Sequence, residues 1–557
     1  MQNAKRSSFA LFSTAITQVM THKVKGFYNL LPYAVLFCAT PLWAQEANNQ
    51  ENVAVAAQAQ PGFDLFELQV DGNTVLDSAL IEKTLYPFLG KGKSVDDVEK
   101  ARQTLEAFYK DKGYPTVLVE IPEQDVVEGL VRLQVVEGSV ERLKVTGSRY
   151  FYLGKITEKV PALAAGQVPY MPAVQEQINA LSKESPDRQV TPVFRAGSTP
   201  GKTEIELRVK DELPLHGSVE INGRNSEHTS RSRIISSIRY DNLWQRFHSA
   251  SLQYQVSPEN PDEVDVWSGT YVLPTGWRDS RLALYGIGIS SNTQLGTSVG
   301  GLSVVGAGSI YGARLMLPLA TFERYSHSVN LGFDYKNFSQ GVKTKGQDTQ
   351  NTPISYAGFQ AGYDGNWRLD DSVTSLSSAL HFSVRGLGND TQEFTQKRVG
   401  AKADYLYLTS ELKHLQQIPW DLRLAARLSG QISNSPLISN EQFSAGGQQS
   451  VRGYYQTQQL GDDGANLSLE LQSPALQQWD FAQNLRAHVF FDYAHLWVQK
   501  PLASNPSSYQ LAGTGVGLRM ELFKHFVSEL DWSYPLYKQS TVDVGNQRID
   551  FRFAYEF

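Results

Sequence analysis

The C-terminal part of the chain, residues 217–557, is built from short segments in which large apolar side chains alternate with polar ones. The final segment has one apolar and one polar face: Ile549, Phe551, Phe553, Tyr555 and Phe557 against Asp550, Arg552, Ala554 and Glu556. A soluble β-sandwich also alternates. Here, however, the polar face carries full charges, and the apolar face carries large side chains up to the last residue. A barrel in lipid requires this arrangement, because its lumen is wet and its outside is hydrocarbon.

The number and length of these segments predict an all-β transmembrane barrel over residues 214–557. About 16 segments, each near the ~9–11 residues that cross a bilayer with tilt, lie between Gly-, Asn-, Asp- and Ser-rich turns. A second clean segment sets large residues against glycines and charges: Val516, Leu518, Met520 and Leu522 against Gly515, Gly517, Arg519 and Glu521. We therefore expect about 16 antiparallel strands.

Composition excludes several other classes of protein. The 557 residues are 41% hydrophobic and 19% charged and contain no uninterrupted apolar run of the 18 or more that a membrane helix needs. The 26 Phe, 26 Tyr and 9 Trp are too many for a disordered chain. A net charge of −6 gives no reason to expect nucleic acid as a partner.

Residues 1–44 have the layout of a secretory signal peptide. Four basic residues and no acidic one precede a short apolar stretch, residues 30–44, which contains two prolines and ends at Ala44. Cleavage is expected after Ala44. An anchor helix is the weaker alternative because the apolar stretch is too short to span a bilayer. A lipoprotein leader through Cys38 is weaker still, since bulky Phe37 precedes it.

Cleavage would leave an exported chain without cysteine. Cys38 is the only cysteine, so the mature protein has neither disulfides nor thiolate metal ligands. The segment that follows, residues 45–62, is rich in Gln, Asn and Ala and ends at Pro61-Gly62. Its composition is compatible with a short helix or with a flexible lead.

Residues 63–213 contain a pattern that repeats once. The first unit, residues 63–137, has a strand (63–70), two helical stretches (77–89 and 95–110) and two closing strands (116–121 and 130–136). Ser94 and Asp97 form a capping box for the second helix. The second unit, residues 138–213, echoes Val70-Asp71-Gly72 as Val145-Thr146-Gly147. Two tandem β-α-α-β-β units are expected, with one ordinary α+β domain as the alternative.

No catalytic or metal-binding arrangement can be defended from the sequence. Gly296-Thr297-Ser298-Val299-Gly300 matches a nucleophile-elbow string, but it lies between two predicted barrel strands rather than on a strand-to-helix turn. The histidines are scattered, without metal-ligand spacing. We therefore expect no enzyme activity, no metal and no cofactor.

One long connection stands out inside the predicted barrel, over residues 432–464. Loops beyond ~12–15 residues are usually functional or disordered. This one contains two glycines that allow a tight fold-back, followed by Val451-Arg452-Gly453-Tyr454. An arginine entering the lumen needs carboxylate partners to offset its desolvation.

The next two strands can supply those partners. The leucines at 467, 469 and 471 are predicted to face lipid, so Glu470 points inward. In the strand 485–493 the same alternation points Phe490 and Asp492 inward. Glu470 and Asp492 are therefore predicted to hold Arg452 on the lumen side of adjacent strands.

These motifs resemble the BamA/TpsB superfamily. A Val-Arg-Gly-Tyr string in a long loop, followed two strands later by Phe490-Phe491-Asp492, is similar to its signature. The two preceding units resemble POTRA domains, and the total resembles its TpsB branch, the transporters of two-partner secretion. A second Val-Arg-Gly, at residues 384–386, lacks the long loop and the Gly-Gly lead. Phe557, with Tyr555 and Phe553, resembles the assembly signal of outer-membrane barrels.

The resemblance implies an outer-membrane pore that exports one large unfolded partner, a TpsA-type haemolysin, adhesin or contact-dependent toxin, without nucleotide. The POTRA-like units would lie in the periplasm and capture this partner by adding a strand to a sheet edge. Barrel assembly machinery and outer-membrane lipid are further expected partners, and the chain is expected to be monomeric. In this family a helix before the first POTRA domain plugs the pore, and residues 46–60 occupy that place.

Two rival functions remain open at this stage. An assembly insertase of the same superfamily would share the Arg452 motif but generally carries more POTRA domains. A passive porin would explain the barrel, but neither the tandem units nor the long loop with its two carboxylates.

Overall fold

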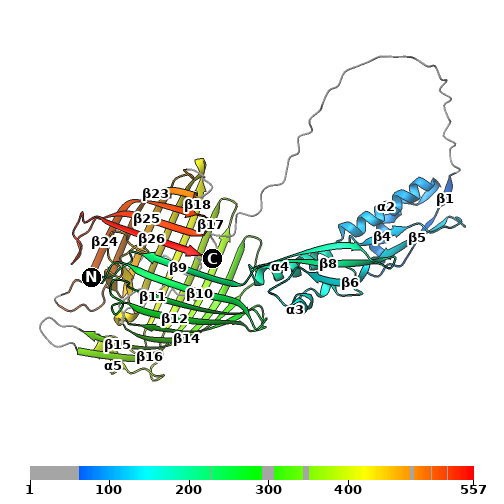
Figure 1. Cartoon of the computed structure of the whole chain (residues 1–557). Coiled ribbons are helices and arrows are strands. Elements are labelled where there is room, and N and C mark those ends of the chain that lie inside the picture. The colour runs from blue at the N-terminus through cyan, green and yellow to red at the C-terminus, as the bar shows by residue number, and fades with distance from the viewer. Residues whose placement is uncertain are drawn as a thin grey trace, which may run out of the picture. The chain divides into compact units, whose positions relative to one another are not determined.

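The computed structural model describes residues 62–227, 229–290, 307–342, 350–476, 482–503, 505–523 and 525–557. The predicted signal peptide, the lead at 46–60 and the Gly296–Gly300 string lie outside these residues. The described chain forms two compact units, which meet in sequence between Pro214 and Leu215. Figure 1 shows the closed barrel and the smaller α+β part.

The first half of the N-terminal unit is a three-stranded sheet covered by helices. Its elements are β1 (Phe63–Leu65), β2 (Glu67–Asp71), α1 (Ser78–Leu85), η1 (Tyr86–Phe88), β3 (Gly90–Lys93), α2 (Val95–Asp111), β4 (Val117–Glu120) and β5 (Leu130–Glu137). Strand β5 lies between β2, which is parallel to it, and β4, which is antiparallel. Strands β1 and β3 form a separate two-stranded sheet.

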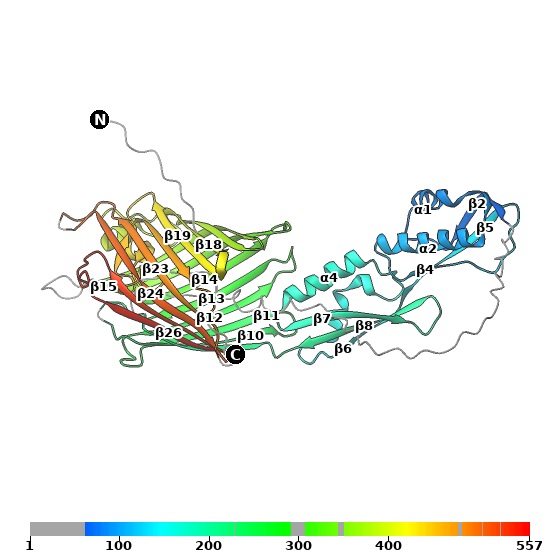
Figure 2. The ribbon, with the colours of Figure 1, turned by 90° about the horizontal axis from the view of Figure 1, so that it is seen from above.

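The second half repeats this topology, as predicted. Its elements are β6 (Ser139–Thr146), α3 (Leu153–Glu158), η2 (Pro161–Leu163), α4 (Met171–Glu184), β7 (Arg188–Ala196) and β8 (Lys202–Asp211). Strand β8 lies between parallel β6 and antiparallel β7, as β5 lies between β2 and β4. Figure 2 shows α4 along one side of the β7–β8 strands.

Helix α2 follows its predicted bounds, whereas the first helix is shorter than predicted. Ser94 and Asp97 form the expected capping box, and the N–H and hydroxyl of Ser94 hold the pKa of the Asp97 carboxyl below its usual value. The prediction of one helix over 77–89 was wrong at its C-terminal end. Helix α1 stops at Leu85 because Pro87 cannot donate a backbone hydrogen bond, and a 3₁₀ turn followed by β3 replaces the last turn.

In the described chain, sixteen antiparallel strands close the barrel, which agrees with the predicted number. The first eight are β9 (Leu215–Asn222), β10 (Arg233–Leu243), β11 (His248–Val256), β12 (Asp265–Pro274), β13 (Arg281–Ile289), β14 (Gly308–Pro318), β15 (Tyr325–Val342) and β16 (Gln350–Arg368). The others are β17 (Ser372–Phe382), β18 (Leu406–Ile418), β19 (Leu422–Ser433), β22 (Asp463–Gln472), β23 (Ala482–Trp497), β24 (Ser508–Leu522), β25 (Phe526–Pro535) and β26 (Arg548–Glu556).

The side-chain alternation of the barrel strands agrees with the predicted faces. On β26, Ile549, Phe553 and Tyr555 are exposed, whereas Asp550 and Ala554 are buried. On β24, Val516 and Leu518 are exposed. Large apolar side chains therefore cover the outside, and charged side chains line the interior. Among the residues that the structure describes, no helix is long and apolar enough to span a bilayer.

The two ends of the barrel differ in the connections they carry. The chain enters at Leu215, and the end where it does so, here called the near end, has short turns such as residues 244–247 and 369–371. The opposite end, the far end, carries the long connections. The two longest are residues 383–405, which contain α5 (Thr391–Lys397), and residues 434–462.

Candidate functional site: the arginine loop on the inner wall

The predicted long connection is present, with slightly different bounds. The prediction of 432–464 overlaps the strands, because β19 continues to Ser433 and β22 begins at Asp463. Within the connection are η4 (Ser439–Glu441) and a small hairpin of β20 (Phe443–Ala445) and β21 (Gln459–Gly461). We call residues 434–462 the arginine loop. Its segment at Val451, Arg452 and Tyr454 is buried.

The tip of the arginine loop is a tight turn that depends on two glycines. Gly446 and Gly447 have φ values of 114° and 98°, in the left-handed region that favours glycine. The N–H of Gly447 donates to the carbonyl of Val451 at 3.1 Å, and the N–H of Ser450 donates to the carbonyl of Gly447 at 3.0 Å. The fold-back predicted from the Gly-Gly pair therefore forms, and it presents Arg452 next.

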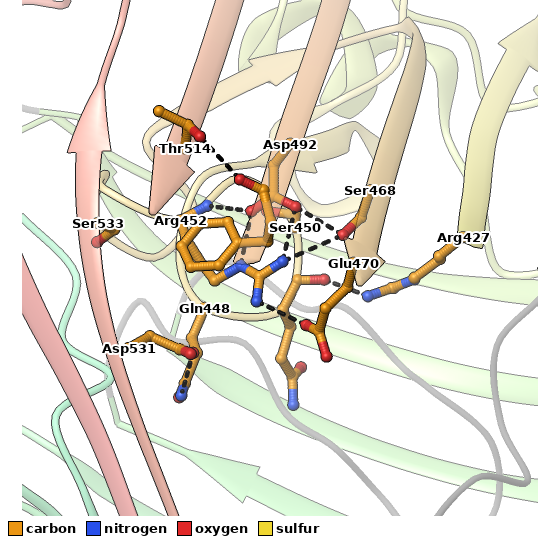
Figure 3. A network of polar contacts seen from close by, with 12 residues as sticks. Arg427, Gln448, Ser450, Arg452, Ser468, Glu470, Asp492, Thr514, Asp531 and Ser533 are labelled. Carbon is orange, nitrogen blue, oxygen red and sulfur yellow. Dashed lines mark hydrogen bonds and ion pairs between the residues drawn. The ribbon is translucent and has the colours of Figure 1, made fainter. Parts of the chain in front are cut away.

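Arg452 binds the two carboxylates predicted for it. Its Nε donates to Asp492 Oδ2 at 2.7 Å and its Nη2 to Asp492 Oδ1 at 2.9 Å, which is a bidentate pair. Its Nη1 donates to Glu470 Oε2 at 3.0 Å. Figure 3 shows the guanidinium between these two side chains and Ser468. Asp492 also accepts the backbone N–H of Arg452 at 3.1 Å, so it fixes the main chain as well as the side chain.

The ring of Phe490 forms the floor of this site. The guanidinium carbon of Arg452 lies 3.4 Å from the centroid of the ring, a stacked cation–π contact. Phe490 was predicted to face inward, and it is buried. The planar guanidinium is thus held at its edge by carboxylates and on its face by an aromatic ring, a geometry that lysine cannot reproduce.

A second arginine, which the sequence interpretation did not include, also binds Glu470. Arg519 on β24 donates from Nη2 to Glu470 Oε2 at 3.1 Å, and it pairs with Glu529 on β25 at 2.8 Å. Glu470 is therefore shared between Arg452 and Arg519. The alternation of β24 placed Arg519 on the polar face, but alternation does not say which residue of the next strand lies opposite.

Three glycines on β24 make room for the loop and for the side chains of the neighbouring strands that surround it. A Cβ at Gly513 would overlap the carbonyl oxygen of Arg452, and one at Gly515 would lie 2.7 Å from the ring of Phe490. A Cβ at Gly517 would overlap His488 and Asp531. Gly513 thus leaves the space in which the loop rests on β24, here called the track, whereas Gly515 and Gly517, which were interpreted only as part of the polar face, leave space for Phe490 and for His488 and Asp531.

Other contacts extend the docking to β25 and to the first far-end connection. Gln448 donates to Asp531 Oδ2 at 3.1 Å, and Asp531 is also bonded to His488 Nε2 at 2.7 Å. Arg224, just after β9, donates to Gln448 at 3.0 Å. The hydroxyl of Tyr454 donates to the carbonyl oxygen of Tyr537 at 2.7 Å. The loop is therefore bound to the last strands of the barrel and to the connection after the first.

The remaining residues singled out from the sequence lie away from this site. Arg385, in the second Val-Arg-Gly string, is exposed, in contrast to Arg452. Phe553, Tyr555 and Phe557 lie on the outside of the barrel. Phe557 also pairs through its backbone with Gly217, since each residue's N–H donates to the other's carbonyl at 3.0 Å.

The barrel is closed by sixteen strands, carries the arginine loop on its inner wall and follows two POTRA-like units in the chain. This combination defines a class, the outer-membrane protein transporters with POTRA domains. The sequence pattern of the haemolysin secretion/activation protein family ShlB/FhaC/HecB matches residues 201–520, and that of the ShlB-type POTRA domain matches residues 63–138. The chain belongs to this haemolysin secretion/activation family, and it is an outer-membrane transporter of two-partner secretion.

Individual relatives are distant but cover nearly the whole chain. The outer membrane transporter CdiB of Dickeya dadantii is 22% identical over 88% of this chain and 87% of its own length. The heme/hemopexin transporter protein HuxB of Haemophilus influenzae is 21% identical over 80% of this chain and 78% of its own length.

Two solved structures share the fold. CdiB from Escherichia coli has a TM-score of 0.59 at 17% identity and covers 90% of this chain and 92% of its own. BamA from Haemophilus ducreyi lacking POTRA domains 1–3 has a TM-score of 0.56 at 15% identity, covering 89% and 100%. Both the CdiB transporter structure and the BamA structure match this fold. The family sequence pattern, rather than the fold, therefore assigns the chain to the transporters.

Proposed function

We propose that this chain exports one large, unfolded TpsA-type partner from the periplasm through the barrel lumen to the cell surface, with no catalytic step of its own. The observation that carries the proposal is the arginine loop docked on the inner wall of a barrel that belongs to a secretion family. A passive porin has no need of POTRA-like units or of this docked loop.

The chain topology supports this direction of transport. The POTRA-like units precede Leu215, so the near end with its short turns faces the periplasm and the far end faces the outside, as in other outer-membrane barrels. Residues 1–44 would direct export and then be removed after Ala44.

The POTRA-like units would capture the partner before it enters the lumen. Their sheets end in the edge strands β2 and β4, and β6 and β7, and each edge offers backbone groups to which an extended peptide can add as a further strand. An unfolded partner supplies such extended segments.

The site at Arg452 would serve secretion by holding the arginine loop in one position. Asp492 and Glu470 are buried, so removing the guanidinium leaves two carboxylates with lost partners. Breaking a buried pair typically costs ~3–5 kcal/mol in a dry site and less in a wet lumen. The loop would then leave its track on β24 while the strand ladder of the barrel persists.

The test is the Arg452→Ala variant, with secretion measured at matched barrel abundance. We expect an inserted, heat-modifiable barrel that exports its partner poorly. The matched control is Arg385→Ala, which removes an exposed arginine from the other Val-Arg-Gly string and should secrete normally. Full secretion by Arg452→Ala would sink the proposed role of the arginine.

The intact mass of the inserted control protein should correspond to a chain beginning at Gln45, and a mass retaining residues 1–44 would contradict the cleavage.

Exchanging the two charges is expected to restore little. In the combined Arg452→Asp and Asp492→Arg variant, an arginine at 492 could no longer accept the backbone N–H of residue 452 or the hydroxyl of Ser468, which donates to Asp492 at 2.6 Å. The swapped charges would also face the unchanged Glu470 and Arg519 in new positions.

A further inference from the structure

The connection between β17 and β18, residues 383–405, folds against the inside of the barrel at its far end. Its helix α5 begins at Asp390, whose side chain caps the N–H of Gln392 at 2.9 Å, and it buries Phe394. The strand residues around it are inward-facing, because their neighbours Leu284, Tyr311 and Phe333 are exposed.

This connection takes part in a dry cluster that we call the far-end cluster. It joins Val264 and strand residues of β12–β16 and β18 to residues 394–405 and to the first residues of the arginine loop. Its members are Val264, Val266, Tyr285, Ile287, Ile289, Ile310, Phe338, Ile354, Tyr356, Phe394, Ala401, Ala403, Tyr405, Tyr407, Leu437 and Ile438. Apolar packing of this extent excludes water from that part of the lumen.

A buried carboxylate fastens the arginine loop to the same wall. Glu441 accepts hydrogen bonds from Lys336 on β15 at 2.6 Å and from Tyr407 on β18 at 2.6 Å, and it also accepts one from Tyr356 on β16. All four side chains are buried. A carboxylate satisfied by one cation and two phenols is a fixed anchor, since each donor would lose its partner if the loop moved.

Asp462, at the other end of the arginine loop, ties the neighbouring connections together. Its carboxylate accepts the backbone N–H of Leu437 at 2.7 Å and that of Gln499, in the connection after β23, at 2.7 Å. It also pairs with Arg398, next to α5, with Nη2 to Oδ2 at 2.6 Å. Arg398 in turn donates to the carbonyls of Leu437 and Gln499.

We propose that residues 383–405 are a lid over the far end of the lumen and that the Arg398–Asp462 pair is the latch that holds it to the arginine loop. The proposal rests on the proposed function as a secretion pore and adds a second, separate closure to it. The arginine loop is held by Arg452 on β22–β25 and by Glu441 on β15, β16 and β18, and the lid is held on β12–β16 and β18. The latch is the ion pair that joins the two connections, in addition to the apolar contacts of the far-end cluster.

The latch is built so that one side can be released without unfolding the other. Asp462 is fully buried, and when Arg398 is removed it still accepts the backbone N–H groups of Leu437 and Gln499. Arg398 retains 19% exposure, so water can reach it. Loss of the guanidinium therefore removes the ion pair between residues 383–405 and the arginine loop, so that only the apolar packing of the far-end cluster still joins the two, while the arginine loop keeps its own hydrogen bonds and its contacts at Arg452.

A single cysteine can report on the lid directly. Cys38 is the only cysteine of the chain, so a Cys38→Ser background is free of thiols. In that background, Ala403→Cys places one thiol in the far-end cluster at a position with no exposed surface. A membrane-impermeant maleimide added to intact cells then labels residue 403 only when the lid opens.

The experiment compares labelling rates in the full-length protein. Arg398→Ala should raise the labelling rate at residue 403 by about tenfold or more over the rate in the parent protein, in which the latch is intact. The reason is that labelling follows the population of the open state. Arg385→Ala, an exposed arginine in the same connection, should leave the rate unchanged. Arg398→Lys, which keeps one charge but not the bidentate pair, should fall between them.

Equal labelling of Arg398→Ala and Arg385→Ala at matched heat-modifiable barrel would overturn the latch. If Arg398→Ala gave no folded barrel, Asp462→Asn would take its place, since it removes the charge while its amide oxygen still accepts one of the two backbone N–H groups, those of Leu437 and Gln499, and the same comparison would decide. Labelling does not require secretion, so a wrong latch and a wrong secretion function give different results. If the latch is wrong, the thiol at residue 403 stays protected from the maleimide in Arg398→Ala. If the secretion function is wrong, no partner is exported.

Discussion

At Gly513 the presence of one methyl group decides whether the arginine loop can dock. The residue lies on the inner face of β24, and a Cβ there would overlap the carbonyl oxygen of Arg452. Backbone cannot move aside as a flexible side chain can, so the strand or the loop has to shift. The site therefore depends on an absent side chain as much as on the charged groups that surround it.

We predict that Gly513→Ala leaves the barrel inserted but lowers secretion at least severalfold. Overpacking of this kind costs about 1–3 kcal/mol, and the flexible partner in the contact is the loop rather than the strand ladder. Gly286→Ala on β13 is the control, because its Cβ would lie 3.4 Å from the Tyr311 ring, an ordinary contact. Secretion and heat-modifiable barrel are measured for both. Equal secretion by the two variants would show that the track on β24 is not needed.

The sequence predicted the partners of Arg452 but not the rest of its surroundings. Alternation alone points Glu470 and Asp492 inward, and in the structure both carboxylates contact Arg452. The shared use of Glu470 by Arg519, and the bond between Gln448 and Asp531, could not be derived. Those contacts depend on the stagger between strands, which a period of two leaves undetermined.

At the scale of elements, the seam between β26 and β9 closes the barrel. Register pairs run only from Arg552–Asn222 to Glu556–Ser218, followed by the reciprocal backbone bonds between Phe557 and Gly217. The ring of Phe557 lies over Gly217, where a Cβ would overlap it. The last residue is therefore part of the seam itself as well as part of the outer apolar face.

Deleting Phe557 is expected to reduce the amount of assembled barrel rather than the transport by each barrel. The deletion removes both hydrogen bonds at the near end of the seam and one aromatic ring on the outer apolar face. Heat-modifiable protein in the outer membrane should fall, and secretion should fall in proportion. Normal barrel abundance together with lost secretion would contradict this assignment.

Element bounds were predictable where a cap or a clean alternation exists and were wrong where a proline acts locally. The Ser94 cap fixed the start of α2, and alternation gave the last strand. The extension of the first helix beyond Leu85 ignored Pro87, and the strand Gly90–Lys93 was missed because two of its four residues are glycines. Its pairing with β1 is a tertiary contact that no local pattern contains.

At the scale of the whole molecule, the chain divides into a unit that precedes Leu215 and the barrel that follows it. The first POTRA-like half has its own apolar core, which includes Leu105, Tyr109 and Leu133. The barrel closes through its own strand ladder. Folding of the barrel and the partner capture proposed for the POTRA-like units therefore depend on separate parts of the chain.

A chain lacking residues 63–138 should insert a barrel of normal abundance and lose secretion by about tenfold or more, because an edge for strand addition is lost. The deletion also uncovers Tyr170, which packs on Tyr114 with ring centroids 5.2 Å apart. Tyr170→Ser in the full-length chain is therefore the control for that exposed surface. Undiminished secretion by the shortened chain would rule out a required role of the first unit.

The position of the arginine loop in the chain has a consequence for the order of events during biogenesis. The loop is synthesised before β22, β23, β24 and β25, yet its tip binds side chains of those later strands and, through Arg224, the connection after β9. It therefore cannot finish docking until the last hairpins have paired and the first strand has met them. A seated Arg452 is thus a late event, and it marks, from inside the lumen, a barrel whose circumference is complete.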